Sequence, residues 1–289
     1  MGDDILDDLE QRLRCISDPL ERAKRAQHLI EQVPVIASRI RFEAVTELSS
    51  TMTHVQIGDV LGLTRARVSQ MLKAGPPPER ALLAPEPGLL TIAVVLKEDA
   101  ETKQGTIALS TRRAVSKLEK LAASMDLETE PEPEAIPKPG HIDLNRSNLA
   151  VLIGPRISSF IAQVVASDPV VRWHQDKRGR WYLSDTRTGT EFHSDFDDGW
   201  EPTRDGERIC IAQIGRIERP DRQGSFLYLG GAHAPGTAGA VDVFIRDVVA
   251  IWNQARRNLW SAVVLTKVDE AGEIVSADLA SPIYVHGRR

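Results

Sequence analysis

The sequence has few cysteines, few aromatic residues and no long apolar run. Cys15 and Cys210 are the only cysteines among 289 residues, which excludes a disulfide framework and a zinc site built on paired cysteines. No apolar stretch approaches the roughly 20 residues that span a bilayer. The acidic start, MGDDILDDLE, is also unlike a basic signal peptide. We therefore expect a cytoplasmic protein with no membrane partner.

The chain also has fewer basic than acidic residues. The formal net charge is −5, from 36 Lys and Arg against 41 Asp and Glu. This balance excludes a broad cationic coat for nucleic acid or membranes, but it permits a local basic face. The seven histidines are scattered without an H-x-x-x-H pair, so we expect no metal site, and no motif calls for a cofactor.

The length and the 42% apolar content fit two packed domains. Apolar residues at three- and four-residue steps over 5–32 predict helix, interrupted near Pro19, and a second helix should begin at Pro34. Glycine and prolines from Gly75 end the helical pattern. We expect a helical domain over 1–80, a linker over 81–88 and a second domain over 89–289.

Residues 53–75, THVQIGDVLGLTRARVSQMLKAG, have the pattern of two short helices around a tight turn. Thr53 and Gln56 have capping-box spacing, Gly62 permits the left-handed turn, and Thr64 can cap the second helix. The first helix should bury Val55, Ile57, Val60 and Leu61, and the second should pack on it through Val68 and Leu72. This pattern predicts a helix-turn-helix.

The outer face of the second helix favours DNA as its partner. Residues 62–75 contain no acidic side chain, whereas an ordinary solvated face usually includes some. Arginine and glutamine suit base edges, and serine, threonine and lysine suit phosphates. The predicted DNA-binding residues are Thr64, Arg65, Arg67, Ser69, Gln70 and Lys73. A helical hairpin that serves only packing is the structural alternative.

The stretch IGDVLGLTRARVSQMLK resembles the helix-turn-helix of bacterial sigma-factor region 4 and of the regulators that reuse it. The resemblance covers about 25 residues and implies that Arg65, Ala66, Ser69 and Gln70 face the major groove. Ala66 departs from a polar contact and could reach only a thymine methyl. Nothing resembles the sigma region that melts promoters, so the resemblance implies a regulator rather than a sigma factor.

The second domain alternates strand and helix patterns. LTIAVVL at 90–96 and the run at 149–153 are typical of strands covered on both faces, and helices follow from Ser110 and after residue 154. The proline-rich ETEPEPEAIPKPG looks like an extended connector, and 171–194 alternates like a small antiparallel meander. This alternation implies an α/β domain with a largely parallel sheet.

Two strand-to-helix loops carry glycines and polar donors. LAVLIGPRISS and YLGGAHAPGTAGA both end a strand and start a helix, where backbone N–H groups suit an anion. The carboxyl ends of parallel strands gather at one edge, so we expect one site. Its predicted ligand-binding residues are Gly154, Pro155, Arg156, Ser158, Ser159, Gly230, Gly231, His233, Gly236 and Thr237.

Neither loop matches GxGxxG or the P-loop, and such glycines often serve only the turn. Their combination resembles Rossmann-like nucleotide-sensing domains, including the SLOG group. The order of the modules resembles regulators of filamentous actinobacteria. The resemblance implies an all-α N-terminal helix-turn-helix domain, then an α/β Rossmann-like domain with a small antiparallel meander, which senses a small anionic or nucleotide-like ligand.

An enzyme is an open alternative. His233 could act as a general base near carboxylates such as Asp185, Asp195, Asp197 and Asp198, yet no nucleophile pairs with it, so we name no catalytic residue. The preferred interpretation is a homodimeric transcriptional regulator that binds double-stranded DNA. A nucleotide-processing hydrolase or glycosyl transferase with an attached helix-turn-helix, and a protein-interaction adaptor, are the alternatives.

Overall fold

The computed structural model describes residues 3–74, 78–86, 88–98, 105–125, 127–135, 142–197 and 207–287. The chain divides into two compact units, Met1–Pro77 and Pro78–Arg289. Each unit has its own hydrophobic core, so we describe them separately.

The first unit contains the helices α1 (Asp3–Arg14), α2 (Pro19–Leu48), α3 (His54–Leu61) and α4 (Arg65–Ala74). Asp18 caps α2 by accepting a hydrogen bond from the backbone N–H of Leu20, and Pro19 occupies the first turn, where its missing N–H costs nothing. The prediction of a separate helix from Pro34 was wrong, because α2 continues through this residue.

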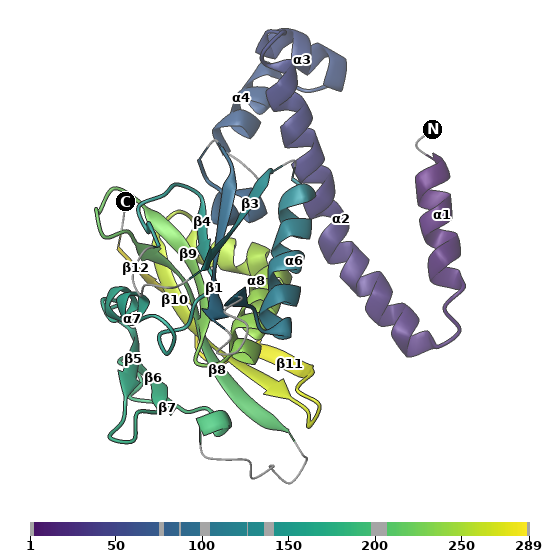
Figure 1. Cartoon of the computed structure of the whole chain (residues 1–289). Coiled ribbons are helices and arrows are strands. Elements are labelled where there is room, and N and C mark those ends of the chain that lie inside the picture. The colour runs from purple at the N-terminus through teal and green to yellow at the C-terminus, as the bar shows by residue number, and fades with distance from the viewer. Residues whose placement is uncertain are drawn as a thin grey trace. The chain divides into compact units, whose positions relative to one another are not determined.

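Helices α3 and α4 lie at the C-terminal end of α2 (Figure 1). Val45 of α2, Ile57 of α3 and Val68 of α4 are completely buried and form the core of this unit. Other apolar residues pack around these three, namely Leu48, Met52, Leu63, Met71 and Leu72. One side chain from each helix therefore fixes the angle between α3 and α4.

The second unit is built on a large mixed sheet with the strand order β11-β10-β8-β9-β4-β1-β2, in which β3 also pairs with β1 and β12 with β10. Its strands are β1 (Leu90–Glu98), β2 (Gly105–Thr106), β3 (Thr129–Ala135), β4 (Leu149–Val151), β8 (Arg208–Glu218), β9 (Ser225–Gly231), β10 (Leu259–Val268), β11 (Ile274–Leu279) and β12 (Tyr284–His286). Strands β3, β1, β4 and β9 run parallel, whereas β9, β8, β10 and β11 alternate in direction.

The predicted fold class is therefore wrong. The chain has mixed α/β content with a mixed sheet and a second small sheet, in place of an all-α domain followed by a Rossmann-like domain with a largely parallel sheet. The reason lies in two short connections. Residues 219–224 join β8 to β9 and residues 269–273 join β10 to β11, and links of this length close hairpins, whereas parallel neighbours need a longer crossover.

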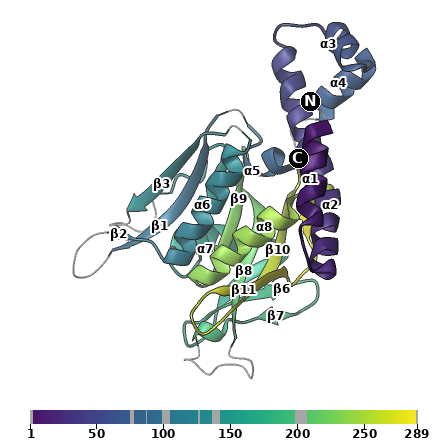
Figure 2. The ribbon, with the colours of Figure 1, turned by 90° about the vertical axis from the view of Figure 1, so that its right-hand side faces the viewer.

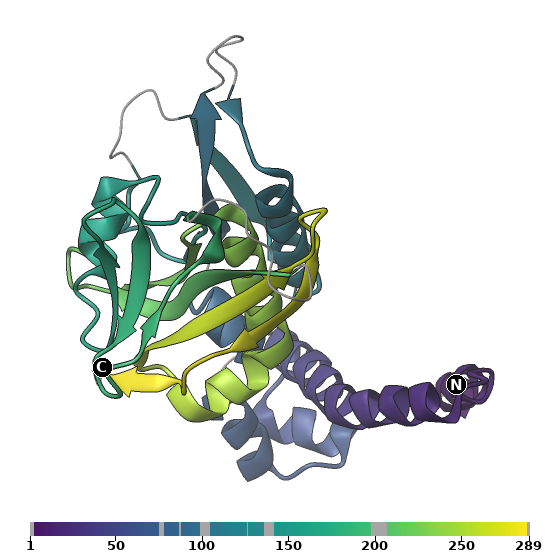
Figure 3. The same ribbon diagram turned by 90° about the horizontal axis from the view of Figure 1, so that it is seen from below.

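Helices cover one face of the large sheet. They are α5 (Pro78–Leu83), α6 (Leu109–Ala123) and α8 (Ala234–Ala255), and α6 and α8 lie side by side. The opposite face is covered by α7 (Ser159–Val165) and by a small antiparallel sheet (Figure 2 and Figure 3). The strands of this sheet are β5 (Val171–Gln175), β6 (Trp181–Asp185) and β7 (Glu191–Phe192), and they coincide with the expected meander. The 3₁₀ turn η1 (Asp195–Asp197) follows β7. Each face has a separate apolar core.

Two segments expected to lack structure are ordered. The proline-rich stretch contains β3, which pairs in parallel with β1, with Pro131 opposite Ile92 and Pro133 opposite Val94. Proline has no backbone N–H to donate to a neighbouring strand. Because Pro131 and Pro133 are two residues apart, both missing N–H groups belong to the same side of β3, and an edge strand tolerates this on the side that pairs with no other strand. Within the expected linker, residues 81–84 are buried in the core of the second unit. Arg216 contributes by donating hydrogen bonds to carbonyl oxygens at the end of α5.

Candidate functional site

The turn between α3 and α4 has the local geometry that the sequence predicts. Thr53 and Gln56 form the capping box, with the Thr53 N–H donating to the Gln56 side chain at 2.9 Å. Gly62 ends α3 in the left-handed conformation at φ 65°. Thr64 caps α4 by accepting a hydrogen bond from the N–H of Arg67 at 3.1 Å. A Cβ at Gly58 would lie 2.5 Å from the carbonyl oxygen of Leu63, so the close turn also needs glycine there.

Most of the predicted DNA-binding residues are exposed on or beside α4. Thr64, Arg65, Arg67 and Gln70 are exposed, and Ala66 is exposed between the two arginines. Ser69 is half-buried, and its hydroxyl lies 3.1 Å from Nδ1 of His54 on α3. Lys73 is also on α4, but its side chain falls outside those that the structure describes.

Helix α3 buries less of its apolar surface than the sequence predicts. Ile57 is completely buried, but Val55, Val60 and Leu61 are 50%, 70% and 42% exposed. The prediction that these three side chains are buried was wrong. Helix α3 is only eight residues long, and the ten-residue α4 covers only the face of α3 that carries Ile57.

In the second unit, the two predicted glycine loops come together. Strands β4 and β9 are parallel neighbours, so their carboxyl ends lie at the same edge of the sheet. A Cβ at Gly154 would lie 1.9 Å from the carbonyl oxygen of Gly231, and a Cβ at Gly231 would lie 2.5 Å from the backbone nitrogen of Thr237. These two glycines therefore allow both loops and the start of α8 to pack in contact.

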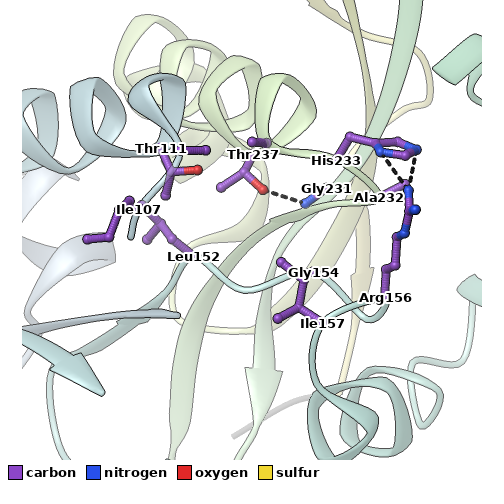
Figure 4. Close-up of a pocket in the computed structure, with 12 residues that line it drawn as sticks. Ile107, Thr111, Leu152, Gly154, Arg156, Ile157, Gly231, Ala232, His233 and Thr237 are labelled. Atoms are coloured by element: carbon purple, nitrogen blue, oxygen red, sulfur yellow. Dashed lines mark hydrogen bonds between the residues drawn. The ribbon is translucent and has the colours of Figure 1, made fainter. Parts of the chain in front are cut away.

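A pocket of about 660 Å³ opens at this edge (Figure 4). Five of the predicted ligand-binding residues line it, namely Gly154, Arg156, Gly231, His233 and Thr237. The remaining lining residues are Ile107, Ala108, Thr111, Leu152, Ile157, Ala232 and Ala234. Arg156 is exposed, and its Nη1 lies 2.9 Å from Nδ1 of His233. An arginine cannot accept a hydrogen bond, so His233 accepts it on a neutral ring nitrogen.

Three of the predicted residues in these loops have structural partners. Ser158 is buried and caps α7 by accepting from the N–H of Ile161 at 3.3 Å. Gly236 packs against β8, where a Cβ would lie 2.6 Å from the carbonyl oxygen of Ile211. The Thr237 hydroxyl accepts a hydrogen bond from the N–H of Gly231 at 3.0 Å. Pro155, Ser159 and Gly230 do not line the pocket described above.

Sequence reasoning missed the contribution of α6. Thr111 lies in the first turn of this helix, and Ile107 and Ala108 directly precede the helix, more than 40 residues before Gly154. Helices α6 and α8 both begin at this pocket, and neither of their N-cap residues, Ala108 and His233, makes a side-chain capping bond. The free N–H groups of a first helical turn carry partial positive charge, which adds to that of Arg156.

Sequence reasoning also missed an aromatic neighbour of the pocket. The ring of Phe196, in η1, stacks on His233 with centroids 5.2 Å apart, and the Arg208 guanidinium lies 4.9 Å from the Phe196 centroid. The stack restrains the His233 ring in the position where Arg156 reaches it. A single phenylalanine in an acidic turn gave no sequence signal for this role.

The carboxylates considered for catalysis lie elsewhere. Asp185 is buried and accepts a hydrogen bond from the Tyr284 hydroxyl, and Asp195 accepts from the N–H of Ile209 at 2.8 Å. The side chain of Asp197 and the whole of Asp198 fall outside the described residues. Trp181 packs edge-on against Trp173, with the ring centroids 6.5 Å apart. Among the described side chains, those of Asp185, Asp195 and Trp181 do not line the pocket beside His233.

Comparison with known proteins finds no match to a family model, to a curated protein or to a solved structure. Within the described ranges, no helix is both long and apolar enough to cross a membrane. In the same part of the chain, no three His, Cys, Asp or Glu side chains are grouped as metal ligands would be. The functional argument therefore depends on the two sites themselves.

Proposed function

We propose that this protein is a cytoplasmic transcriptional regulator of the helix-turn-helix type, in which α4 enters the major groove of double-stranded DNA. The second unit binds a small anionic or nucleotide-like ligand in the pocket between Arg156 and the start of α8. The ligand acts by population shift: it binds one arrangement of the DNA-binding units more tightly than another and so makes that arrangement more frequent.

The observation that carries the DNA-binding part is the exposed face of α4. Arg65, Arg67 and Gln70 are exposed on a helix whose position is fixed by Ile57 and Val68. Arginine and glutamine can each form two hydrogen bonds to a purine edge, which suits guanine and adenine respectively. Thr64 stands at the N-terminus of α4, where a phosphate would meet the free helical N–H groups.

The pocket supports the ligand-binding part. Its volume falls within the range of small-molecule sites, and its wall combines aliphatic groups with one arginine. The guanidinium and the starts of α6 and α8 all bring positive charge to the same space, which favours a phosphate or carboxylate. The side chains of Ile107, Leu152 and Ile157 offer an apolar surface on which a nucleotide base could pack.

A binding titration on labelled DNA tests the proposal. The affinity of the wild-type chain should fall steeply as salt rises from about 50 to 200 mM, because phosphate contacts release counterions. Arg65→Ala combined with Gln70→Ala should abolish the preference for a selected sequence over a scrambled one. Arg178→Ala combined with Gln175→Ala removes the same two side-chain types from the end of β5 and the β5–β6 turn of the second unit, and it should leave DNA binding unchanged. Equal preference in wild type and in the α4 variant would contradict the proposal.

A further inference from the structure

Among the described side chains of α2, only those of its last turn contribute to the core of the first unit. Among the described side chains, the first buried apolar residue is Val45, and every residue packed around the core of the first unit follows it. Residues 3–44 are nevertheless helical except for the turn before Pro19. Helices of this length are maintained in proteins mainly by packing of an apolar face, so α2 requires a partner for the face it leaves exposed.

That face has coiled-coil spacing. Ile30, Val33 and Ile40 are 67%, 42% and 58% exposed. Small residues continue the line at alternating three- and four-residue steps in both directions. We call this line the α2 seam, and it consists of Ala23, Ala26, Ile30, Val33, Ala37, Ile40 and Ala44. All but the half-buried Ala26 are exposed, and a sustained 3–4 repeat is the pattern of helices that pair along their length.

We propose that the α2 seam is the surface on which a second copy of this chain pairs, with the two α2 helices antiparallel. In this register Ile30 faces Ile40 of the second copy, Val33 faces Ala37, and Ala26 faces Ala44. The same contacts occur twice about the two-fold axis, which passes near residue 35, as a closed dimer requires.

Charge at the ends of the seam selects the antiparallel direction. The next seam position after Ala44 is Glu47, which is exposed, and Arg22 directly precedes the first. In the antiparallel register Glu47 of each copy lies beside Arg22 of the other. A parallel pair would instead place the two Glu47 carboxylates side by side and align the two helix dipoles, both of which are unfavourable.

The area needed for a stable dimer brings in α1. A strip from Ala23 to Glu47 is about 37 Å long and about 10 Å wide, or about 370 Å² on each copy. Stable interfaces bury about 800 Å² per partner, roughly twice as much. Helix α1 contacts α2 and carries Leu9 and Leu13, both half-buried. Its 12 residues add a strip of about 180 Å² on each copy, so a second copy that packs on both helices buries about 550 Å² per partner, close to the lower end of that class.

The pairing has a consequence for DNA that rests on the proposed function. About the centre at residue 35, the two copies of Val45 lie about 30 Å apart and the two copies of Leu48 about 39 Å apart, from a rise of 1.5 Å per residue. These residues hold α3 and α4. Dimeric helix-turn-helix proteins bind half-sites one turn of DNA apart, about 34–36 Å. The antiparallel dimer therefore places the α2 ends that hold α3 and α4 at about the spacing of successive major grooves.

The mass in solution tests the pairing without DNA. Light scattering at micromolar concentration should give twice 31.9 kDa for wild type and 31.9 kDa for the variant Ile30→Glu with Ile40→Glu. Leu89→Glu with Val275→Glu changes two exposed aliphatic residues of the second unit and should remain dimeric. A monomeric wild type, or a seam variant that keeps the dimer mass, overturns the proposal.

Cross-linking tests the direction and does not depend on the folding of a charged variant. In a Cys15→Ser background, Ile30→Cys protein with an affinity tag is mixed with untagged Ile40→Cys protein and oxidised mildly. The antiparallel pair predicts a disulfide between the two different variants and little within either one. Self-cross-linking of each variant alone would establish a parallel pair and overturn the proposal. Arg65→Ala with Gln70→Ala should lose DNA preference and keep the dimer mass, so the two proposals fail separately.

Discussion

Arg156 and His233 come from two different strand-to-helix loops, 77 residues apart, and lie within hydrogen-bonding distance, with Nη1 2.9 Å from Nδ1. The contact forms because β4 and β9 are parallel neighbours whose carboxyl ends coincide. It positions one guanidinium at the mouth of the pocket, beside the starts of α6 and α8. The ligand-binding proposal depends on this charge.

Removing Arg156 should weaken anion binding without weakening the fold. Pyrophosphate and nucleotides should raise the melting temperature of wild type, and Arg156→Ala should lose most of that shift. A hydrogen bond to a charged group contributes about 1.5–3 kcal/mol, so we expect binding to be about 10- to 100-fold weaker. The unliganded variant should melt close to wild type, because Arg156 is exposed.

Arg178→Ala, which removes an exposed arginine from the β5–β6 turn, is the control and should keep the wild-type shift. No shift with any of these anions in wild type would leave the glycine loops as structural features alone. Product formation during the incubation would favour the nucleotide-processing alternative. A chromatographic assay of the nucleotide after each melt checks this directly.

A methyl group at position 154 should destabilise the second unit strongly. The Cβ of Gly154→Ala would lie 1.9 Å from the Gly231 carbonyl oxygen, which is backbone and cannot move aside cheaply. We expect a loss of about 3 kcal/mol in the free energy of unfolding. All five tryptophans follow residue 170, so their fluorescence during urea unfolding reports on this unit.

Gly189→Ala is the matched control for that loss. Its φ of 73° disfavours alanine, but no atom lies within 4 Å of the added Cβ, so the cost should be only about 1–2 kcal/mol. Equal losses at both positions would show that the two strand ends do not pack as closely as described.

The hydrogen bond from Tyr284 to Asp185 should make the free energy of unfolding depend on pH in the alkaline range. Burial of Tyr284, reinforced by the Asp185 carboxylate that accepts its hydrogen bond, raises the pKa of the tyrosine to about 12. Burial opposes ionisation of Asp185, but the hydrogen bonds from Tyr284 and from the N–H groups of Arg187 and Thr188 outweigh it and hold the pKa of Asp185 below its ordinary value.

The folded state therefore keeps the Tyr284 proton where the unfolded chain, with a tyrosine pKa of about 10, releases it. The stabilisation is complete below about pH 10 and is lost as the pH rises towards 12. Tyr284→Phe should cost about 2 kcal/mol at pH 7 and distinctly less at pH 11, measured by urea unfolding. An equal cost at both pH values would contradict the assigned hydrogen bond.

Local features of the sequence predicted local structure well. The capping box at Thr53, the left-handed Gly62 and the cap at Thr64 depend on residues within four positions of one another, and all three are confirmed. The same holds for β1, where a continuous apolar run determines the element. Interactions over a few residues are fixed by propensity and capping chemistry before any tertiary contact.

Long-range features were predicted less well. The sheet was expected to be largely parallel because strand and helix patterns alternate, but the short links before β9 and β11 close hairpins. Strand β3 was missed because Pro131 and Pro133 disfavour strands except at an edge, and the sequence does not say which strand is at the edge. In the pocket, the two glycine loops were found, but Thr111 and Phe196 come from segments with no related pattern.

Selection of bound sequences from random double-stranded DNA, at one defined salt concentration, tests the central claim most directly. Wild type should enrich a sequence motif, and the Arg178→Ala and Gln175→Ala control should enrich the same motif. Arg65→Ala with Gln70→Ala should enrich none, because it removes the exposed side chains of α4 that suit base edges. Failure of wild type to enrich any motif, or recovery of the same motif by the α4 variant, would contradict the account.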